Sequence, residues 1–355
     1  MEENKETMGM LDLMIRPVFC VKDHKIVKVN SAAEGLMLAA GTDISSLLQT
    51  GIEEYAAFED GCLYLMLNIG GQSLGASVTR IGDWDVFSLE QDADQAELRS
   101  MALAARELRE PLSSVMITAD RLFPMSALEE DAETREQVAR LNRGLFQMLR
   151  ILGNMSDAGR SCTTSRQETR EIGGLFHEIF EKAESLIAHT GLKLTYEGLQ
   201  EAVYCLADAE QLERAVLNIL SNAIKFTPKG GTIEARLTRK GRFLRLSVQD
   251  SGSGIAETVR GSVFGRYLRQ PALEDSRFGI GLGMVLIRSA ATNHGGTVLI
   301  DQPTGKGTRI TMTLAIRQNA DTVLHSPVMR VDYAGERDHG LLELSDCLPV
   351  DLYKI

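Results

Sequence analysis

The chain has no long apolar segment, no excess of positive charge and no paired cysteines. None of its apolar runs approaches the roughly 20 residues of a membrane-spanning helix, and its start, MEENKETMGM, lacks the apolar core of a signal peptide. Its formal net charge of -11 does not support nucleic-acid binding, which requires a basic face. We therefore expect a cytoplasmic protein with no transmembrane segment and no nucleic-acid partner.

The five cysteines are scattered, odd in number and without a CxxC pair, so they predict neither a zinc site nor a disulfide framework. Their positions are Cys20, Cys62, Cys162, Cys205 and Cys347. What the chain does contain is typical of a globular protein, because 44% of its 355 residues are hydrophobic and 25% are charged. This composition can bury a core, and the length suits roughly two to three domains.

Residues 1–90 are predicted to form a small mixed α/β unit. Two short β-rich runs flank a turn at Lys22–His24, and further strand-like runs occupy residues 62–90. The breaks between these later runs fall at Gly70–Gly71 and Gly82–Asp83. This order resembles a PAS sensor domain, in which the sheet typically cups a ligand or serves as a dimer surface. The unit has no flavin-attaching cysteine motif, and we interpret His24 as a turn residue rather than a haem ligand.

Residues 91–160 are predicted to form a two-helix hairpin. Two interleaved rows recur every seven residues, namely Leu98, Ala105, Leu112 and Ala119, and Met101, Leu108, Val115 and Leu122. After a break at Phe123–Pro124 the pattern resumes with Val138, Leu141, Leu145, Met148, Leu152 and Met155. Two such helices cannot close a core alone, so we expect residues 94–157 to form a homodimeric four-helix bundle. An intramolecular bundle is the alternative, but the chain has no further heptad segments to supply it.

Residues 161–318 return to an α/β pattern. Strand-like runs form one expected β-hairpin that turns at Lys240–Gly241 and a second over the segment GTVLIDQPTGKGTRITMTLAI. Residues 319–355 have a mixed character to which no chemistry can be assigned. A docked tail and an added regulatory segment are equally compatible with this last stretch.

The strongest chemical signal is the segment DAEQLERAVLNILSNAIKFTPKGG, residues 208–231. It predicts a helix whose buried stripe lies opposite Asn218 and Asn222, four residues apart, with Lys225 one turn further. Neutral amide oxygens can hold a magnesium ion that carries a triphosphate without adding charge repulsion. A lone asparagine pair would be an ordinary solvated surface, so the longer segment is what points to a nucleotide.

Two further segments complete the pattern. In VQDSGSGIAE, Asp250 ends a strand and is followed by glycines, which suits recognition of the amino group of a base. In GIGLGMVLIRSAATNHGG, three glycines open an apolar helix and leave backbone N–H groups free to face phosphates. These glycines are Gly279, Gly281 and Gly283. Taken alone, the first segment is a common turn and the second could be a hinge.

In this order and spacing the three segments resemble the N, G1 and G2 boxes of the histidine-kinase catalytic domain, a member of the GHKL group of ATP-binding domains. The segment VFGRYLRQ looks like the F box of that family, although Gly265 stands where an acidic residue is usual. His294 matches the HGG turn of the family and is expected to be structural. The relatives that hydrolyse ATP have a glutamate in place of Asn218 to activate water, so its absence favours phosphoryl transfer over hydrolysis.

The resemblance also implies roles for single residues. Asn222 would be the principal Mg²⁺ ligand with Asn218 as its polar neighbour, Lys225 would contact phosphate, and Asp250 would bind the adenine amino group. The remaining ATP-binding positions would be Gly252, Gly254, Arg266, Tyr267, Gly279, Gly281, Leu282 and Gly283. Of these, Arg266 and Tyr267 would border a mobile lid over ATP at residues 268–278.

The first hairpin helix carries a segment, ARELREPL, that resembles the H box S-H-E-L-R-T-P-L of histidine kinases. The register places Arg106 at the position of the phosphate-accepting histidine. Arginine stays protonated and is a poor nucleophile, so it cannot replace a neutral imidazole. Glu107, the presumed proton-accepting neighbour, is retained, whereas Glu110 replaces the Thr or Asn that often orients water for phosphatase action. None of the six histidines lies in the hairpin, and we interpret the nearby Ser113 and Thr118 as ordinary helix-surface residues.

The expected fold class is α+β and multidomain, with a small PAS-like sensor, a dimerising helical hairpin and an α/β sandwich that binds ATP and Mg²⁺. The expected function is that of a two-component sensor histidine kinase-like protein that transfers phosphoryl to, or regulates, a response regulator or partner kinase. Because of Arg106, ordinary self-phosphorylation is not expected. Two alternatives stay open: a nucleotide-binding pseudokinase or scaffold that modulates a response regulator or true kinase, and a protein-serine kinase of the GHKL group.

Overall fold

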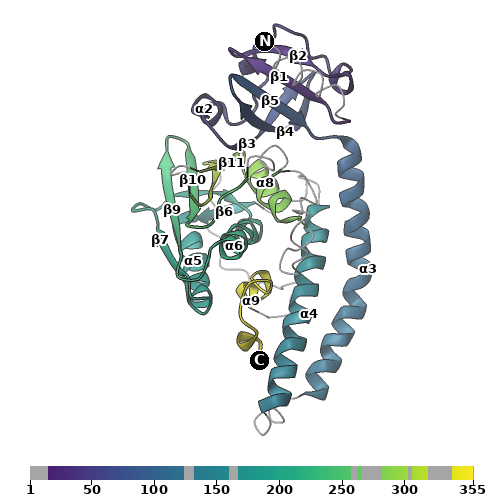
Figure 1. Ribbon diagram of the computed structural model, residues 1–355, viewed down its shortest axis with the longest axis vertical. Helices are drawn as coiled ribbons and strands as arrows, with labels where there is room; N and C mark the ends of the chain where they lie inside the picture. The colour runs from purple at the N-terminus through teal and green to yellow at the C-terminus, as the bar shows by residue number, and fades with distance from the viewer. Residues whose placement is uncertain are drawn as a thin grey trace.

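The computed structural model describes residues 15–123, 132–159, 167–256, 263–264, 281–302, 306–318 and 338–354. These residues form a mixed α and β structure with a small upper unit, a long helical hairpin and a larger layered unit beside it (Figure 1). The arrangement confirms the predicted α+β class. Among the described residues, no helix combines the length and the apolar character needed to cross a membrane.

The N-terminal unit is built around an antiparallel sheet with strand order β2-β1-β5-β4-β3. Its strands are β1 (Val18–Lys22), β2 (Lys25–Val29), β3 (Cys62–Ile69), β4 (Gln72–Ile81) and β5 (Trp84–Leu89), and its short helices are η1 (Ser31–Ala33), η2 (Ile44–Ser46) and α2 (Ile52–Ala56). The predicted breaks fall between strands as expected. Asp23 and His24 have positive φ in the turn between β1 and β2, and His24 is therefore a turn residue.

The hairpin consists of two long helices, α3 (Asp92–Leu122) and α4 (Ala132–Ala158). One heptad row of α3, which includes Ala105 and Leu112, is buried. In the other row Met101 is half-buried, whereas Leu108, Val115 and Leu122 stay on the outside and are 53%, 52% and 67% exposed. In α4 the same alternation buries Val138, Leu145 and Leu152 and exposes Leu141 and Met148. A single copy therefore buries only half of the apolar seam.

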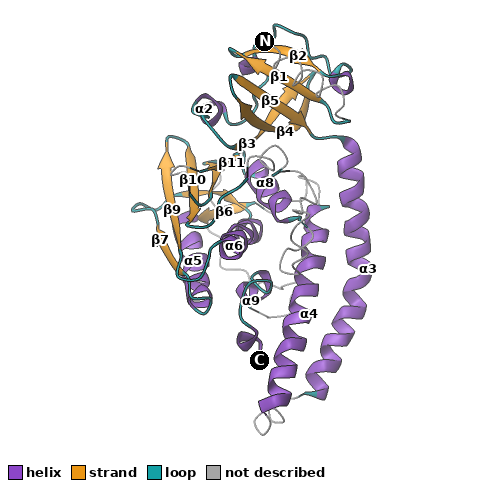
Figure 2. Cartoon of the chain, viewed as in Figure 1, coloured by secondary structure: helices purple, strands orange, loops and turns teal. Residues whose placement is uncertain are grey.

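The larger unit is a sheet covered on one face by helices (Figure 2). Its strands continue the order β11-β12-β10-β9-β7, with β7 parallel to β9 and the other neighbours antiparallel. The strands are β7 (Lys193–Glu197), β9 (Thr232–Lys240), β10 (Phe243–Asp250), β11 (Val298–Asp301) and β12 (Arg309–Ala315), and a separate pair is formed by β6 (Glu168–Glu171) and β8 (Tyr204–Ala207). The covering helices are α5 (Ile172–Ala188), α6 (Ala209–Phe226) and α8 (Gly283–Asn293).

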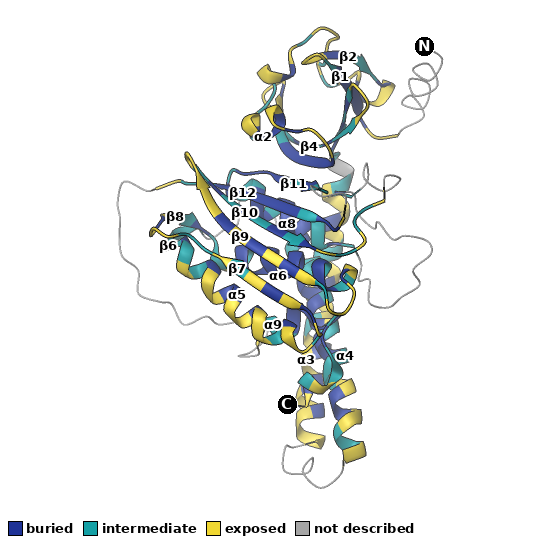
Figure 3. Ribbon diagram, turned by 60° about the vertical axis from the view of Figure 1, so that its left-hand side comes forward, coloured by how far each residue is buried: buried dark blue, intermediate teal, exposed yellow. Residues whose placement is uncertain are grey.

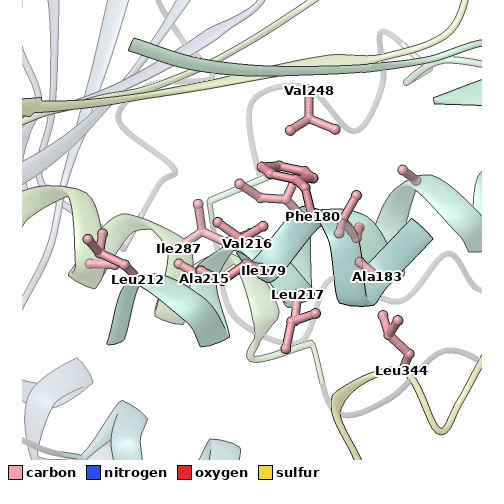
Figure 4. Packing of buried hydrophobic residues seen from close by; sticks show 14 of the residues in the cluster. Ile179, Phe180, Ala183, Leu212, Ala215, Val216, Leu217, Val248, Ile287 and Leu344 are labelled. Carbon is pink, nitrogen blue, oxygen red and sulfur yellow. The ribbon is translucent and has the colours of Figure 1, made fainter. Parts of the chain in front are cut away.

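Apolar and polar residues alternate along the strands, and the apolar face of the sheet is the one that the helices cover. In β9 the buried residues Ile233, Ala235 and Leu237 alternate with exposed ones, and Figure 3 shows the resulting stripes. These side chains belong to the same core cluster as apolar residues of α5 and α6, and Figure 4 shows Val248 of the neighbouring β10 facing Phe180 of α5. Gly241 has positive φ in the turn after β9, where the sequence predicts the hairpin to turn.

Two long-range features of the fold were not predicted. The edge strand β3 of the N-terminal unit pairs with β11, so that both units share one ten-stranded sheet. The end of the chain, with α9 (His339–Glu343) and η5 (Val350–Tyr353), packs between α4 and the helices α5 and α6 (Figure 1). Of the two open possibilities for this stretch, its last residues form a docked tail.

Candidate functional site

The candidate nucleotide site is organised by α6. Asp208 caps this helix, because its Oδ1 accepts a hydrogen bond from the backbone N–H of Gln211 at 3.1 Å. His294 fixes the same end from behind: its Nε2 accepts the N–H of Asp208 at 3.0 Å, and its Nδ1 donates to the carbonyl of Ala290 at 2.7 Å. Burial lowers the pKa of His294, which keeps the ring neutral as this pairing requires. His294 is therefore structural, as expected.

The two asparagines of α6 share one face of the helix, and other elements cover that face. Asn218 is 2% exposed; its Nδ2 donates to the carbonyl of Arg214 at 2.8 Å. Its Oδ1 accepts from the guanidinium of Arg150, which belongs to α4, at 3.4 Å. Asn222, one turn further, is half-buried and its Nδ2 lies 3.9 Å from Sδ of Met284. The face that the sequence predicts to lie opposite the core is therefore enclosed by the hairpin and by α8.

The glycine segment before α8 reaches the asparagines through its backbone. A Cβ atom on Gly283 would lie 3.1 Å from Oδ1 of Asn218, so only glycine allows this close approach without displacing the amide. Gly281 has a positive φ of 81°. Leu282 is buried with Leu98 and Ala158 of the hairpin, so its contribution to a phosphate would be its backbone N–H. The structure thus brings the second and third predicted segments of the sequence against the first.

Asp250 lies at the end of β10, beside the start of the glycine-containing turn. Its Oδ1 accepts the backbone N–H of Gly252 at 2.8 Å and that of Thr308 at 3.1 Å. Burial raises the pKa of Asp250, and these two hydrogen bonds oppose that rise. The side-chain hydroxyl of Thr308 is a third hydrogen-bonding partner of this carboxylate and opposes the rise as well.

The turn after Asp250 requires its glycines. A Cβ atom on Gly252 would meet the carbonyl oxygen of Phe226, and one on Gly254 would meet the amide of Gln302. Gly254 also has a positive φ of 75°. The loop can therefore approach the end of α6 closely. Of the other predicted residues, Gly279, Arg266, Tyr267 and the lid at 268–278 lie outside the described residues, as does Gly265.

Lys225 already has an anionic partner within the chain. Its ammonium is buried and lies 3.0 Å from Oδ2 of Asp346, which belongs to the docked end of the chain. Burial lowers the pKa of Lys225, and the neighbouring guanidinium of Arg150 lowers it further, whereas Asp346 raises it. The lysine predicted to contact phosphate is thus engaged by a carboxylate.

Four charged residues around α6 were not predicted from the sequence: Arg150, Arg214, Glu343 and Asp346. Arg150 forms ion pairs with both Glu343 and Asp346, and Arg214 pairs with Glu343 and with Asp157 of α4. All four are less than a tenth exposed. No local pattern marks them, because the two arginines lie within helices and their partners lie far along the chain. Their ion pairs depend on the docked end of the chain, which brings Glu343 and Asp346 to α6.

The H-box segment lies on the exposed side of α3. Arg106 and Glu107 are both exposed, and Ala105 beside them is buried against the hairpin. The hydroxyl of Ser113 donates to the carbonyl of Arg109 at 2.9 Å. Thr118 makes the equivalent bond to Ser114 at 2.8 Å. Both hydroxyls behave as ordinary helix-surface groups.

The described residues contain no cluster of three or more His, Cys, Asp or Glu side chains that could hold a metal ion. A cation at this site would therefore take amide oxygens and ligand oxygens rather than a carboxylate cage. Asn222 fits that role, because its Nδ2 faces Met284 and nothing among the described residues donates to its Oδ1. Amide oxygens beside a glycine-rich helix start are a donor set that suits a magnesium–phosphate group.

The fold and this set of residues define an ATPase-type nucleotide domain. Residues 207–318 match the family described as histidine kinase-, DNA gyrase B- and HSP90-like ATPases. An uncharacterised sensor-like histidine kinase of Rhizobium meliloti is 29% identical over 280 residues, which cover 73% of this chain and 52% of the relative. The adaptive-response sensory kinase SasA of Crocosphaera subtropica is 27% identical over 275 residues, covering 72% of this chain and 70% of the relative. Over nearly three quarters of its length the chain is therefore similar to sensor histidine kinases.

Among solved structures, full-length ShkA in complex with AMPPNP is similar at 23% sequence identity and a TM-score of 0.49, covering 62% of this chain and 46% of that chain. The chain spans about half the length of the rhizobial relative.

Proposed function

We propose that this protein is a two-component sensor histidine kinase-like protein that binds ATP with Mg²⁺ on α6 and transfers phosphoryl to, or regulates, a partner. The observation that carries the proposal is the meeting of three sequence-distant groups, namely Asn218 with Asn222, Gly283 and Asp250. An acceptor for a base, a backbone approach for phosphates and amide ligands for a cation lie in one place. A response regulator or a partner kinase is the class of partner that suits a member of this family.

The residues of the chain have separable tasks at this site. Asp250 would accept a hydrogen bond from the adenine amino group through Oδ2, because its Oδ1 is already held by two backbone N–H groups. Asn222 would orient the cation, which when bound neutralises phosphate charge. The backbone before Gly283 would face the phosphates. The hairpin contacts of Leu282 and Val285 hold that backbone in place.

The experiment that tests the proposal is a calorimetric titration of the full chain with ADP, with Mg²⁺ and with EDTA. We expect binding in Mg²⁺ and a clear loss of affinity in EDTA. Asn222→Ala is expected to weaken Mg²⁺-dependent binding at least about tenfold, since even partners outside the first ligand shell of a metal are worth roughly 10- to 100-fold in affinity. Asn68→Ala, at an exposed position of β3, is the control. No heat of binding from the wild type would contradict the proposal.

We further propose that residues 94–157 pair with a second copy. The exposed heptad positions of α3 and α4 support this, because Leu108, Val115 and Leu122 of α3 and Leu141 and Met148 of α4 are exposed in a single chain. Covering the row in a four-helix bundle would bury side chains worth about 1.5–3 kcal/mol each.

Leu108→Glu and Val115→Glu together are expected to convert a dimer to a monomer, because the bundle would bury two unpaired carboxylates per chain. Leu103→Glu and Ile117→Glu are matched controls. These residues are also exposed apolar residues of α3, 65% and 54%, but they lie off both heptad rows. Light scattering after size exclusion measures the mass. A wild-type monomer, or equal dissociation by the control pair, would contradict the predicted interface.

The pseudokinase alternative rests on Arg106. Its exposed guanidinium stands where this family has its acceptor, and the described hairpin contains no histidine. The proposed protein therefore does not phosphorylate itself at this position. The phosphoryl group would pass to a partner, or the bound nucleotide would act through conformation alone. The protein-serine kinase alternative is supported by no separate feature of the site.

A further inference from the structure

Residues 338–354, here called the C-terminal segment, are docked in a defined position. Leu342, Leu344, Leu348 and Tyr353 are at most 1% exposed, and Leu344 joins the core cluster of α5 and α6 (Figure 4). Asp338 caps α9 through the N–H of Leu341. Side chains of α4 hold the backbone: Arg143 donates to the carbonyls of Ser345 and Asp346, and Asn142 donates to that of Tyr353. The segment therefore bridges the hairpin and the ATPase domain.

The acidic residues of this segment reach the polar face of α6. Glu343 is fully buried, 3.0 Å from Nε of Arg214 and 3.5 Å from Nε of Arg150. Asp346 pairs with Arg150 and with Lys225. The docked segment thus supplies carboxylates to three buried cations that approach from two different elements.

One oxygen atom is the centre of this network. Oδ2 of Asp346 lies between the ammonium of Lys225 and the guanidinium of Arg150. The same guanidinium reaches Oγ of Ser221 at 3.1 Å and Oδ1 of Asn218 at 3.4 Å. Arg150 is therefore part of the asparagine face of α6, although it belongs to the hairpin. A guanidinium and an ammonium that share one anionic oxygen are also the donors that bind phosphate oxygens.

We propose that Arg150 and Lys225 form a two-cation site for a phosphoryl oxygen of the nucleotide, and that Asp346 occupies this site from within the chain. The C-terminal segment and the nucleotide then compete for the same donors. This inference rests on the proposed nucleotide site. It adds a hairpin residue to that site and assigns a regulatory role to the end of the chain.

Competition follows from charge. A phosphoryl oxygen and the Asp346 carboxylate cannot share the position, because like charges at that separation repel strongly in a site with little water. The buried cations also need an anion at all times, since an unpaired buried charge is costly. A phosphoryl group of the nucleotide can replace the Asp346 carboxylate as the anion beside these cations. Water cannot replace it, because the position is buried. Release of the segment would also remove its hydrogen bonds to Arg143 and Asn142 of α4, and so loosen the hairpin from the ATPase domain.

The test compares the affinity of the full chain for ADP with Mg²⁺ in wild type and in Asp346→Asn. We expect the variant to bind roughly tenfold more tightly. An internal competitor lowers the apparent affinity in proportion to the fraction of molecules whose site is left open, so removing the competitor restores the intrinsic affinity. Asp351→Asn is the matched control. Asp351 is an exposed aspartate of the same segment that pairs with Lys354 instead of α6. It should leave the affinity unchanged.

Two further measurements separate the parts of the proposal. Hydrogen exchange of residues 338–354 should speed up when ADP binds wild type, and should already be faster in Asp346→Asn. Arg150→Gln introduced into the Asp346→Asn chain should lower affinity about tenfold, because one phosphate donor is lost without freeing a competitor.

The outcomes distinguish this inference from the proposed function. No ADP binding by any variant contradicts the nucleotide site itself, and this inference falls with it. Equal affinities of wild type and Asp346→Asn, with exchange of the segment unchanged by ADP, contradict the competition alone. An unchanged affinity on adding Arg150→Gln to Asp346→Asn removes Arg150 from the phosphate site.

Discussion

Arg106→His is expected to acquire an acid-labile phosphate from ATP, whereas the wild-type protein acquires none. The substitution places an imidazole at the acceptor position of the H-box segment, on the exposed side of α3. A neutral imidazole can attack a phosphoryl group, and a guanidinium that stays protonated cannot. Glu107 follows it and remains exposed, so the proton-accepting neighbour is already present. The change is from no signal to a measurable one.

The measurement is transfer of label from γ-labelled ATP to the full chain, followed by acid and base treatment, because phosphohistidine is lost in acid and survives base. Arg99→His is the matched control. Arg99 is also exposed and lies seven residues earlier on the same face of α3, but outside the H-box segment. Adding Asn222→Ala to Arg106→His should remove the label, which ties it to the nucleotide site.

Each result decides between the open functions. Label on Arg106→His alone means that the hairpin and the ATPase domain are both competent and that only the acceptor is missing. An unlabelled Arg106→His chain that binds nucleotide favours the pseudokinase. Acid-labile label on the wild type would mean that the interpretation of Arg106 is wrong.

The Asp250→Asn protein is expected to bind adenine nucleotides more weakly than the wild type and to prefer guanine nucleotides. In the wild type, Oδ1 accepts two backbone N–H groups and Oδ2 would accept the adenine amino group. An asparagine has only one oxygen. Whichever way its amide is turned, an NH₂ group faces either the two backbone donors or the adenine amino group. Leaving such a donor unsatisfied costs about 1–3 kcal/mol, which is roughly 5- to 150-fold in affinity.

Guanine provides the control within the same experiment. Its O6 accepts a hydrogen bond where adenine has an amino group, so the outward NH₂ of the substituted side chain would find a partner. Titrations of wild type and Asp250→Asn with ADP and GDP should therefore show a reversed preference. Equal loss of both nucleotides would indicate a damaged turn at Gly252 rather than a base contact. Unchanged ADP affinity would contradict the assignment of Asp250.

Local chemistry made much of the fold predictable. The helix α6 within the segment 208–231 and the turns at His24 and Gly241 all lie where the sequence places them. Each depends on residues within a few positions of one another. The heptad rows predicted both helices of the hairpin, but not that one chain buries a single row, because a row by itself does not say which neighbour covers it.

The residues of the proposed nucleotide site were predictable from the sequence because they lie in three short segments with a recognisable order and spacing. The asparagines, Asp250 and the glycines before α8 are brought together by the strands and helices that carry them. The enclosure of the asparagine face was not predictable. Asn218 is buried because Arg150 of the hairpin lies over it, and no periodicity in α6 contains that information.

The sequence by itself thus determined the elements and predicted the class of nucleotide site and an arginine at the acceptor position, since these depend on local spacing and on the chemistry of single side chains. Only the tertiary structure decided that β3 joins the sheet of the ATPase domain and that the end of the chain engages Lys225. Arg150 and Asp346 are 196 positions apart. Their ion pair forms because folding removes both charges from water, and a buried charge is stable only beside its opposite.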